Sequence, residues 1–244
     1  MLNLVIALAV GSFFAVAVKL AHFSLWAGIV PGVIAFIVAY LLLARRISQK
    51  VQLLMNEVQK ELSVQPANAR DRQARVDRSV KMLESGLVYE RWQFLVGPEI
   101  HAQIGMIKYM FKDLDGAAVH FAKASPRNYM ALAMKAALQY QRKQFEPMKA
   151  TFEAAVKSGK KEAIVWAAYA WCLQSLKDKD GALRVLARAV ELNPSDAKLK
   201  SGLTALQNDK KLKMKPYEPL WWQFGLENPP LEMGGGRQVR FSRR

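Results

Sequence analysis

The residues that most often carry chemistry are few and far apart in this chain. One cysteine, Cys172, and three histidines, His22, His101 and His120, occur in 244 residues. No acidic residue is placed to orient His101 or His120, and nothing cationic flanks Cys172 to activate its thiol. Zinc, nucleophile-elbow and phosphate-loop motifs do not occur in the sequence. The sequence therefore predicts no enzymatic activity, no metal and no cofactor.

The composition is that of a folded, strongly basic protein. There are 36 Lys and Arg residues against 20 Asp and Glu residues, a formal charge of +16, and 52% of the residues are hydrophobic. This balance excludes a disordered or collagen-like chain, and one cysteine excludes an intrachain disulfide framework. Anionic lipid, nucleic acid or an acidic protein face would each attract the positive surplus.

Two apolar stretches predict a transmembrane helical hairpin over residues 1–45. The stretch Leu2–Val18 has only two polar side chains, and Leu25–Ala44 has no charged residue. About 20 helical residues cross a hydrocarbon core of about 30 Å, and the shorter first stretch spans it with some bilayer thinning. The link Lys19–Ser24 fits a tight turn. A cleaved signal peptide is the alternative, but it would need a basic region before Leu2.

The basic residues beside the two stretches predict their orientation. Arg45, Arg46 and Lys50 follow the second stretch, whereas the link offers only Lys19 and His22. The positive-inside rule then places both ends of the hairpin in the cytoplasm. We therefore expect an integral protein of a bacterial inner membrane whose C-terminal part is cytoplasmic.

Two glycines in the second stretch have two possible roles. Gly28 and Gly32 form a small-xxx-small pair, which is weak evidence for helix dimerisation. Alternatively, the pair marks a kinked start of the second span, because Pro31 lies between the two glycines.

Residues 46–96 are predicted to form a charged helical connector. Its apolar residues recur at steps of three and four, as on one face of a helix. They are Ile47, Val51, Leu54, Val58 and Leu62 in one helix, and Val76, Val80, Leu83 and Leu87 in a second helix that begins near Ala67 or Ala69. The first stripe could form a short dimer seam. Arg70, Arg72 and Arg75 are expected on a solvated face, or against anionic headgroups or an acidic partner.

The region after residue 97 is self-similar. Its clearest unit, Ala163–Asp196, places the large Trp166 and Tyr169 before the small Ala170 and ends its second half at Pro194. Small residues let two antiparallel helices approach closely, while large residues fill the space beside them. This pattern resembles the tetratricopeptide repeat (TPR), a helix–turn–helix unit of about 34 residues that stacks into a right-handed solenoid.

Two further units resemble the repeat less closely. Tyr129–Glu162 lacks the terminal proline, and Pro98–Asn128 has a second helix about three residues short because Pro126 arrives early. Ser195–Gln207 would be a capping helix. The resemblance predicts an all-α fold in which the two-helix transmembrane hairpin is followed by a TPR-like α-solenoid over residues 97–208. A helical bundle with chance periodicity is the alternative.

The resemblance also implies a binding groove on the concave face, built from the first helix of each unit. Apolar, aromatic and amide side chains at the family's groove positions suit a hydrophobic peptide or amphipathic helix as protein partner. The implied groove residues are Met106, Tyr109, Met130, Tyr140, Gln141, Ile164, Trp171 and Gln174. Core packing between repeats is the alternative role for Tyr140 and Trp171.

Residues 209–244 are predicted to form an extended C-terminal tail, because four prolines and three adjacent glycines forbid a long helix. Trp221 and Trp222 are costly to leave in water. We expect these two anchors to dock on the domain's own surface, at the bilayer interface or on a partner. Four arginines within residues 237–244 suit anionic lipid or an acidic protein better than nucleic acid, since no nucleic-acid-binding fold stands beside them.

Together these features predict a membrane-anchored TPR-like adaptor or scaffold that recruits or assembles a protein partner at the membrane. The alternative is a nucleic-acid or ribosome-associated membrane factor that uses the basic connector and tail, for which steeply salt-dependent binding is expected. An enzyme would need a cluster of active-site residues that the sequence does not reveal.

Overall fold

The computed structural model describes residues 1–21 and 25–228. Within them the chain forms α-helices and short 3-10 helices, with no strand in the described ranges. It divides into two compact units. The N-terminal unit contains Met1–Ile107 and Ala122–Ser125, and the C-terminal unit contains Lys108–Phe121 and the chain from Pro126 onward. The all-α prediction is therefore confirmed.

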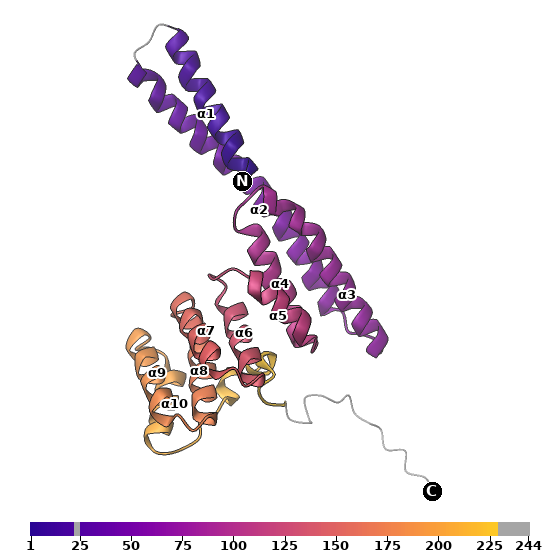
Figure 1. Ribbon diagram of the computed structural model, residues 1–244, viewed down its shortest axis with the longest axis vertical. Coiled ribbons are helices and arrows are strands. Elements are labelled where there is room, and N and C mark those ends of the chain that lie inside the picture. Colours follow the sequence, from indigo (N-terminus) through magenta and orange to yellow (C-terminus); the bar gives the residue numbers. More distant parts are fainter. Residues whose placement is uncertain (22–24, 229–244) are drawn as a thin grey trace. The chain divides into compact units, whose positions relative to one another are not determined.

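The predicted hairpin consists of α1 (Leu2–Leu20) and the first part of α2 (Leu25–Ser63), which pack against each other (Figure 1). Small residues set their separation. A Cβ atom on Gly32 would lie 2.8 Å from the Gly11 carbonyl oxygen, and one on Gly28 would lie 2.8 Å from the Ala15 carbonyl oxygen. The two glycines of the second stretch thus serve contact between helices of the same chain, so the dimerisation role considered above does not apply to these faces.

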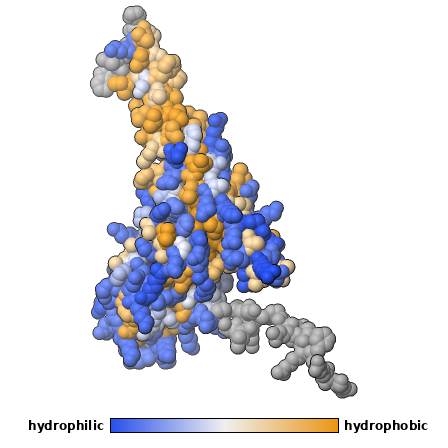
Figure 2. Space-filling view, turned by 45° about the vertical axis from the view of Figure 1, so that its right-hand side comes forward, coloured by the Kyte–Doolittle hydropathy of each residue, from blue (hydrophilic) through white to orange (hydrophobic). Residues whose placement is uncertain are grey.

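The outer surface of the hairpin is apolar. Both helices are long and apolar enough to cross a membrane. Large hydrophobic side chains such as Phe13, Val30 and Leu41 point outward and are exposed. Figure 2 shows hydrophobic residues gathered over this part of the N-terminal unit. A helix buried in the core of a soluble protein would hide such side chains, whereas a lipid-facing helix would present them.

The helix α2 continues beyond the apolar stretch and packs against α3 (Ala69–Gly86). The predicted stripes meet at this contact, where Val58 and Leu83 are buried. The first stripe therefore packs on α3 of the same chain, which leaves it unavailable as a dimer seam. The side chain of Asn68 caps α3 by accepting a hydrogen bond from the Asp71 N–H at 2.8 Å. Leu87, expected in α3, instead begins the 3-10 helix η1 (Leu87–Arg91).

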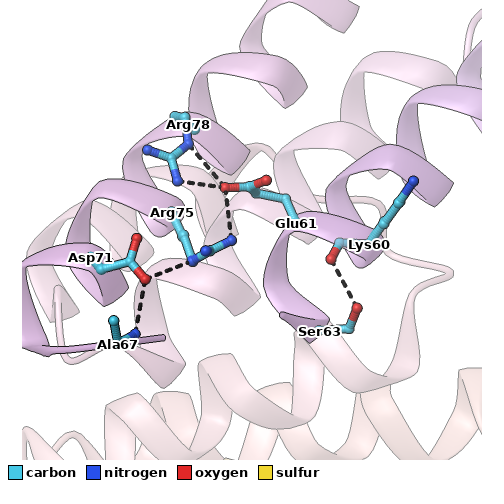
Figure 3. Close-up of polar contacts among 7 residues, drawn as sticks. All are labelled: Lys60, Glu61, Ser63, Ala67, Asp71, Arg75 and Arg78. Carbon is cyan, nitrogen blue, oxygen red and sulfur yellow. Dashed lines mark hydrogen bonds and ion pairs between the residues drawn. The ribbon is translucent and has the colours of Figure 1, made fainter. Parts of the chain in front are cut away.

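Part of the basic connector is neutralised within the chain (Figure 3). Arg78 contacts Glu61 Oε1 through Nη2 at 2.7 Å and through Nε at 2.9 Å. Arg75 lies 3.5 Å from the same oxygen and 3.0 Å from Asp71 Oδ2. The pKa of Asp71 is lowered by a hydrogen bond from the Ala67 N–H and by Arg75. These pairs tie the start of α3 to the end of α2, so Arg75 is not a freely solvated charge.

Three successive helix pairs and one further helix follow in the described chain (Figure 1). The pairs are α4 (Val96–Met110) with α5 (Leu114–Lys123), α6 (Tyr129–Gln141) with α7 (Phe145–Ser158), and α8 (Ala163–Ser175) with α9 (Lys179–Leu192), followed by α10 (Ala197–Gln207). The helix α5 has 10 residues against 14 in α7 and in α9, as expected from the early Pro126.

The first helix of each pair ends in the same way, and so does α10. A residue with positive φ follows each of these helices, and the next N–H reaches back to a carbonyl five residues earlier. The positive-φ residues are Lys112, Lys143, Lys177 and Asp209. This is the closure expected of a helix C-terminus that reverses the chain. The four ends are therefore equivalent in backbone geometry even where their sequences differ.

Aspartate caps explain the turn that two units share. Asp113 and Asp178 accept hydrogen bonds from the N–H groups of Gly116 and Gly181 at 2.9 and 2.8 Å. A Cβ atom on either glycine would lie within 2.5 Å of the capping carboxylate. Each aspartate and the glycine three residues later thus act together, because the carboxylate caps the helix and the glycine leaves room for it.

Replacing Asp178 with Ala is expected to lower the free energy of unfolding by about 1 kcal/mol, because the orphaned N–H groups at the start of α9 lose their acceptor. Urea denaturation followed by circular dichroism measures the change. Glu191→Ala, which removes the same charge from an exposed site near the other end of α9, is the control. Equal effects of the two variants would show that net charge, rather than the cap, is responsible.

The large residues of the clearest unit lie in the core of the C-terminal unit. Trp166 is buried and donates from Nε1 to the Lys160 carbonyl oxygen at 3.0 Å. Tyr169 stacks on Phe152 with ring centroids 5.0 Å apart. Met148, which replaces the small residue expected in α7, is also fully buried. Tight contact between α7 and α8 therefore joins one helix pair to the next.

Candidate peptide-binding groove

The C-terminal segment, defined here as residues 210–228, packs onto the C-terminal unit. It contains only two short 3-10 helices, η2 (Lys215–Tyr217) and η3 (Leu220–Phe224), as the prolines predicted. The helix η3 contacts both α6 and α8, the first helices of two neighbouring pairs. These are the helices that the family resemblance assigned to the groove. The part of the predicted tail from residue 229 onward, including its arginines, lies outside the described residues.

An amide side chain holds the start of the segment by its main chain. Gln174, in the last turn of α8, accepts a hydrogen bond from the Leu212 N–H at 2.9 Å and donates one to the Lys210 carbonyl oxygen at 3.2 Å. Leu212 is buried, and a Cβ atom on Gly202 of α10 would lie 2.9 Å from its side chain. Gln174 thus binds the main chain of the segment at Lys210 and Leu212. Gly202 of α10 leaves room for the Leu212 side chain.

Aromatic rings hold the middle of the segment. Trp221 is fully buried, and its ring meets that of Trp171 edge-on, with centroids 5.2 Å apart. Trp171 in turn contacts Tyr140 of α6 at 5.9 Å. The Trp221 Nε1 donates to Glu227 Oε2 at 2.7 Å, so its polar atom is satisfied within the segment. A buried, hydrogen-bonded tryptophan is the type of residue that dominates binding energy at peptide interfaces.

A tyrosine and a second amide hold the end of the segment. Tyr109 of α4 donates from Oη to the Phe224 carbonyl oxygen at 2.5 Å. Gln141 of α6 donates from Nε2 to Tyr109 Oη at 2.9 Å and to the Gly225 carbonyl oxygen at 3.1 Å. Burial raises the pKa of Tyr109, so its hydroxyl stays protonated and available as a donor. Gly225 has a φ of 56°, which favours glycine at this bend.

Four of the eight predicted groove residues contact the segment directly: Tyr109, Gln141, Trp171 and Gln174. Tyr140 supports Trp171 by ring contact. The contact between Tyr140 and Trp171 joins α6 to α8. Packing between repeats, the alternative role for these two residues, therefore occurs together with the contact of Trp171 to the segment. Of the remaining three residues, Ile164 is buried, and Met106 and Met130 are half-buried.

The two predicted tail anchors differ in their surroundings. Trp221 is fully buried in the groove, which agrees with docking on the domain's own surface. Trp222 is only half-buried, and its Nε1 is shielded from solvent without a hydrogen-bond partner among the described residues. Of the two tryptophans, Trp221 is therefore the stronger anchor.

Sequence reasoning missed the apolar residues that accompany the tryptophan. Leu212, Met214, Tyr217 and Phe224 are all buried. The stretch from Lys211 to Lys215 alternates lysine with an apolar residue, which is the pattern of an extended strand with one buried side. That alternation was a signal for docking of residues 211–215. Phe224 carries no such pattern.

Burial shifts the pKa of two of the residues most able to do chemistry, Cys172 and His101. Cys172 is fully buried, and burial raises the pKa of its thiol well above the usual range. Burial, with a smaller effect of Lys123, lowers the pKa of His101. His22 lies outside the described residues. In residues 1–21 and 25–228, no group of three or more His, Cys, Asp or Glu side chains could hold a metal ion.

No known family model matches the chain, and comparison with curated proteins finds no match. Among solved structures, the chain is similar to one described as "MamA RS-1 ArsTM double mutant". The sequence identity is 20% and the TM-score 0.46, with 72% of this chain and 93% of that chain covered.

Proposed function

We propose that this protein is a membrane-anchored TPR-like adaptor whose groove binds an extended, aromatic-anchored peptide. One observation carries the proposal: Gln174, Tyr109 and Gln141 hydrogen-bond main-chain atoms of a bound segment, while Trp171 contacts its tryptophan. Main-chain hydrogen bonds give affinity for any extended peptide, and a pocket for one side chain gives specificity. A groove with this chemistry is suited to binding a protein partner.

The occupant of the groove is the chain's own C-terminal segment, which defines the kind of partner segment that fits. Such a segment is extended, places an apolar residue opposite Gln174, and carries a tryptophan about nine residues later, as Leu212 and Trp221 do. A tethered segment competes at an effective concentration that can reach the millimolar range. A partner segment must therefore bind more tightly than the tethered one or act where the tethered one is weakened.

The hairpin would keep this groove at a membrane. The support is the exposed apolar surface of α1 and α2 together with the exposed Arg45 and Arg46 at the end of the apolar stretch. Under the positive-inside rule the solenoid over residues 97–208 lies in the cytoplasm, and the hairpin lies in a bacterial inner membrane. The nucleic-acid alternative gains nothing from Arg75 and Arg78, because both are paired with Glu61.

A peptide added in trans tests the groove. We expect a synthetic peptide of residues 210–228 to bind the full-length Trp221→Ala protein with a Kd of about 1–10 µM and the wild-type protein at least about tenfold more weakly, because the intact segment competes. Isothermal titration calorimetry in detergent measures both affinities. The peptide that itself carries Trp221→Ala is the matched control.

The same titration contains the outcome that would contradict the proposal. A double variant, Trp171→Ala with Trp221→Ala, lacks the aromatic contact on both sides and should bind the wild-type peptide much more weakly than the single variant. Equal binding by the single and double variants would show that the peptide associates elsewhere. If the Trp221→Ala peptide bound as tightly as the wild-type peptide, the groove would not select for the tryptophan of the segment.

A further inference from the structure

A second apolar surface lies in the N-terminal unit, in η1 and the residues that link η1 to α4. The interfacial segment, defined here as Val88–Leu95, exposes 60% of Val88, 67% of Phe94 and 38% of Leu95. Large apolar side chains this exposed are costly to leave in water when they lie next to one another in a short segment. The groove does not use these residues, which belong to the other compact unit.

Backbone hydrogen bonds fix the place of this segment against the hairpin. The Met1 nitrogen donates to the Arg91 carbonyl oxygen, and the Asn3 N–H donates to the Trp92 carbonyl oxygen at 3.4 Å. Met1 and Asn3 are the first residues of the apolar span. Since α1 has 19 residues and rises about 1.5 Å per residue, its length is close to the thickness of a hydrocarbon core, about 30 Å. Its first residues therefore mark the edge of that core.

The second helix places basic side chains at the same edge. Gly11 faces Gly32 and Ala15 faces Gly28, so α1 and α2 run antiparallel. Continuing this register brings the first residues of α1 opposite the end of the apolar stretch of α2, just before Arg45.

Aromatic and basic groups also mark the segment itself. The Lys50 ammonium of α2 lies 6.0 Å from the centre of the Tyr89 ring, which holds η1 against α2. Arg91 is exposed and Trp92 is half-buried. Tryptophan, tyrosine and arginine at the end of a span are typical of the level of the lipid headgroups.

We propose that the interfacial segment is a lipid-binding site, in which Phe94, Leu95 and Val88 insert into the headgroup–acyl boundary while Arg91, Arg45 and Arg46 meet anionic headgroups. The proposal rests on the proposed membrane anchoring of the hairpin. Leu2, Leu4 and Val5, at the end of α1 that contacts the segment, are also exposed. Because α4 begins at Val96, directly after the segment, insertion would fix the depth at which the first repeat starts.

Fluorescence quenching in vesicles tests the site in the full-length protein. Phe94→Cys in a Cys172→Ala background is labelled with an environment-sensitive dye and reconstituted into vesicles of phosphatidylcholine and phosphatidylglycerol. We expect lipids that carry a spin label just below the headgroup to remove about half of the dye's fluorescence, because the label sits at the boundary. Leu95→Cys, labelled in the same way, gives a second reading if the first variant folds poorly.

Two further labelling positions separate the possible failures. Gln73→Cys lies at the start of α3, beside the Glu61 end of α2 and about 24 Å of helix beyond Arg45, and should remain unquenched. Leu8→Cys lies within the span, and deep spin labels should quench it. Quenching at Leu8 without quenching at Phe94 and Leu95 would overturn the lipid site while leaving the anchor intact. Absence of quenching at all three would overturn both proposals.

A protein contact would give a different pattern. If the Phe94 label showed a blue-shifted emission that spin-labelled lipids left unchanged, the side chain would be buried against protein and the lipid site would be wrong. Replacing phosphatidylglycerol with phosphatidylcholine throughout is expected to reduce the quenching at Phe94 and to leave the quenching at Leu8 unchanged, because only the interfacial segment uses headgroup charge.

Discussion

Replacing Trp221 with Ala is expected to release the C-terminal segment from the groove while the helix pairs stay folded. Truncation of a fully buried tryptophan costs about 3–5 kcal/mol. The loss of stability cannot exceed the free energy with which the segment docks on the groove, because the rest of the unit stays folded after the segment has left. A loss of about 3 kcal/mol corresponds to roughly 100-fold faster exchange of the Leu212 amide, which Gln174 holds at 2.9 Å. Hydrogen exchange measured by mass spectrometry detects this change.

Leu220→Ala is the matched control for this variant, because Leu220 lies in the same 3-10 helix and is 43% exposed. Its effect on exchange should be small. Trp171→Ala removes the other partner of the ring contact and should release the same peptides. If residues 210–217 stayed protected in the Trp221→Ala protein, the segment would be held by contacts other than its tryptophan.

Replacing Phe152 with Ala is expected to destabilise the whole C-terminal unit. Phe152 is fully buried and stacks on Tyr169, with ring planes 11° apart, across the junction between α7 and α8. A cavity of this size costs about 3–5 kcal/mol. Each pair of a helical-repeat protein is stabilised by its neighbours, so loss at one junction weakens both sides. We expect the Tm, measured by circular dichroism, to fall by about 10 °C.

Phe145→Ala provides the comparison on the same helix, because Phe145 is 37% exposed and its ring lies 6.2 Å from that of Tyr140. Its Tm should fall by no more than about 3 °C. Phe152→Ala and Trp221→Ala together distinguish the core from the groove, since Phe152→Ala lowers the helical signal on heating whereas Trp221→Ala leaves it nearly unchanged. Similar Tm values for Phe152→Ala and wild type would contradict the tight junction.

The helix pairs were predictable because their signals are local. The predicted units Tyr129–Glu162 and Ala163–Asp196 begin at the first residues of α6 and α8. The early Pro126 correctly indicated a short α5. Lysines with positive φ at the ends of α4, α6 and α8 carry no strong sequence signal, because lysine is not a usual left-handed residue. Their conformation follows from the closing hydrogen bond of each helix.

The groove could be predicted only in part. Trp171 and Gln174 were implied by their positions on the first helix of a repeat, and both contact a bound segment. The direct contact of Tyr109 with Phe224 joins residues 115 positions apart, and no local pattern encodes such a pair. Gly28 and Gly32 are a similar case, since a small-residue face fits a helix of the same chain as well as one of another chain.

By itself, the sequence indicated which segments are helical, which surfaces are apolar and that the tail carries tryptophans that are costly to leave in water. Only the tertiary structure decided that α1 covers the glycines of α2 and that the chain's own residues 210–228 fill the groove. The physical reason is that side-chain chemistry determines how costly a surface is to expose. Which surface covers it depends on the reach of the chain and on the fit of shapes formed by distant residues.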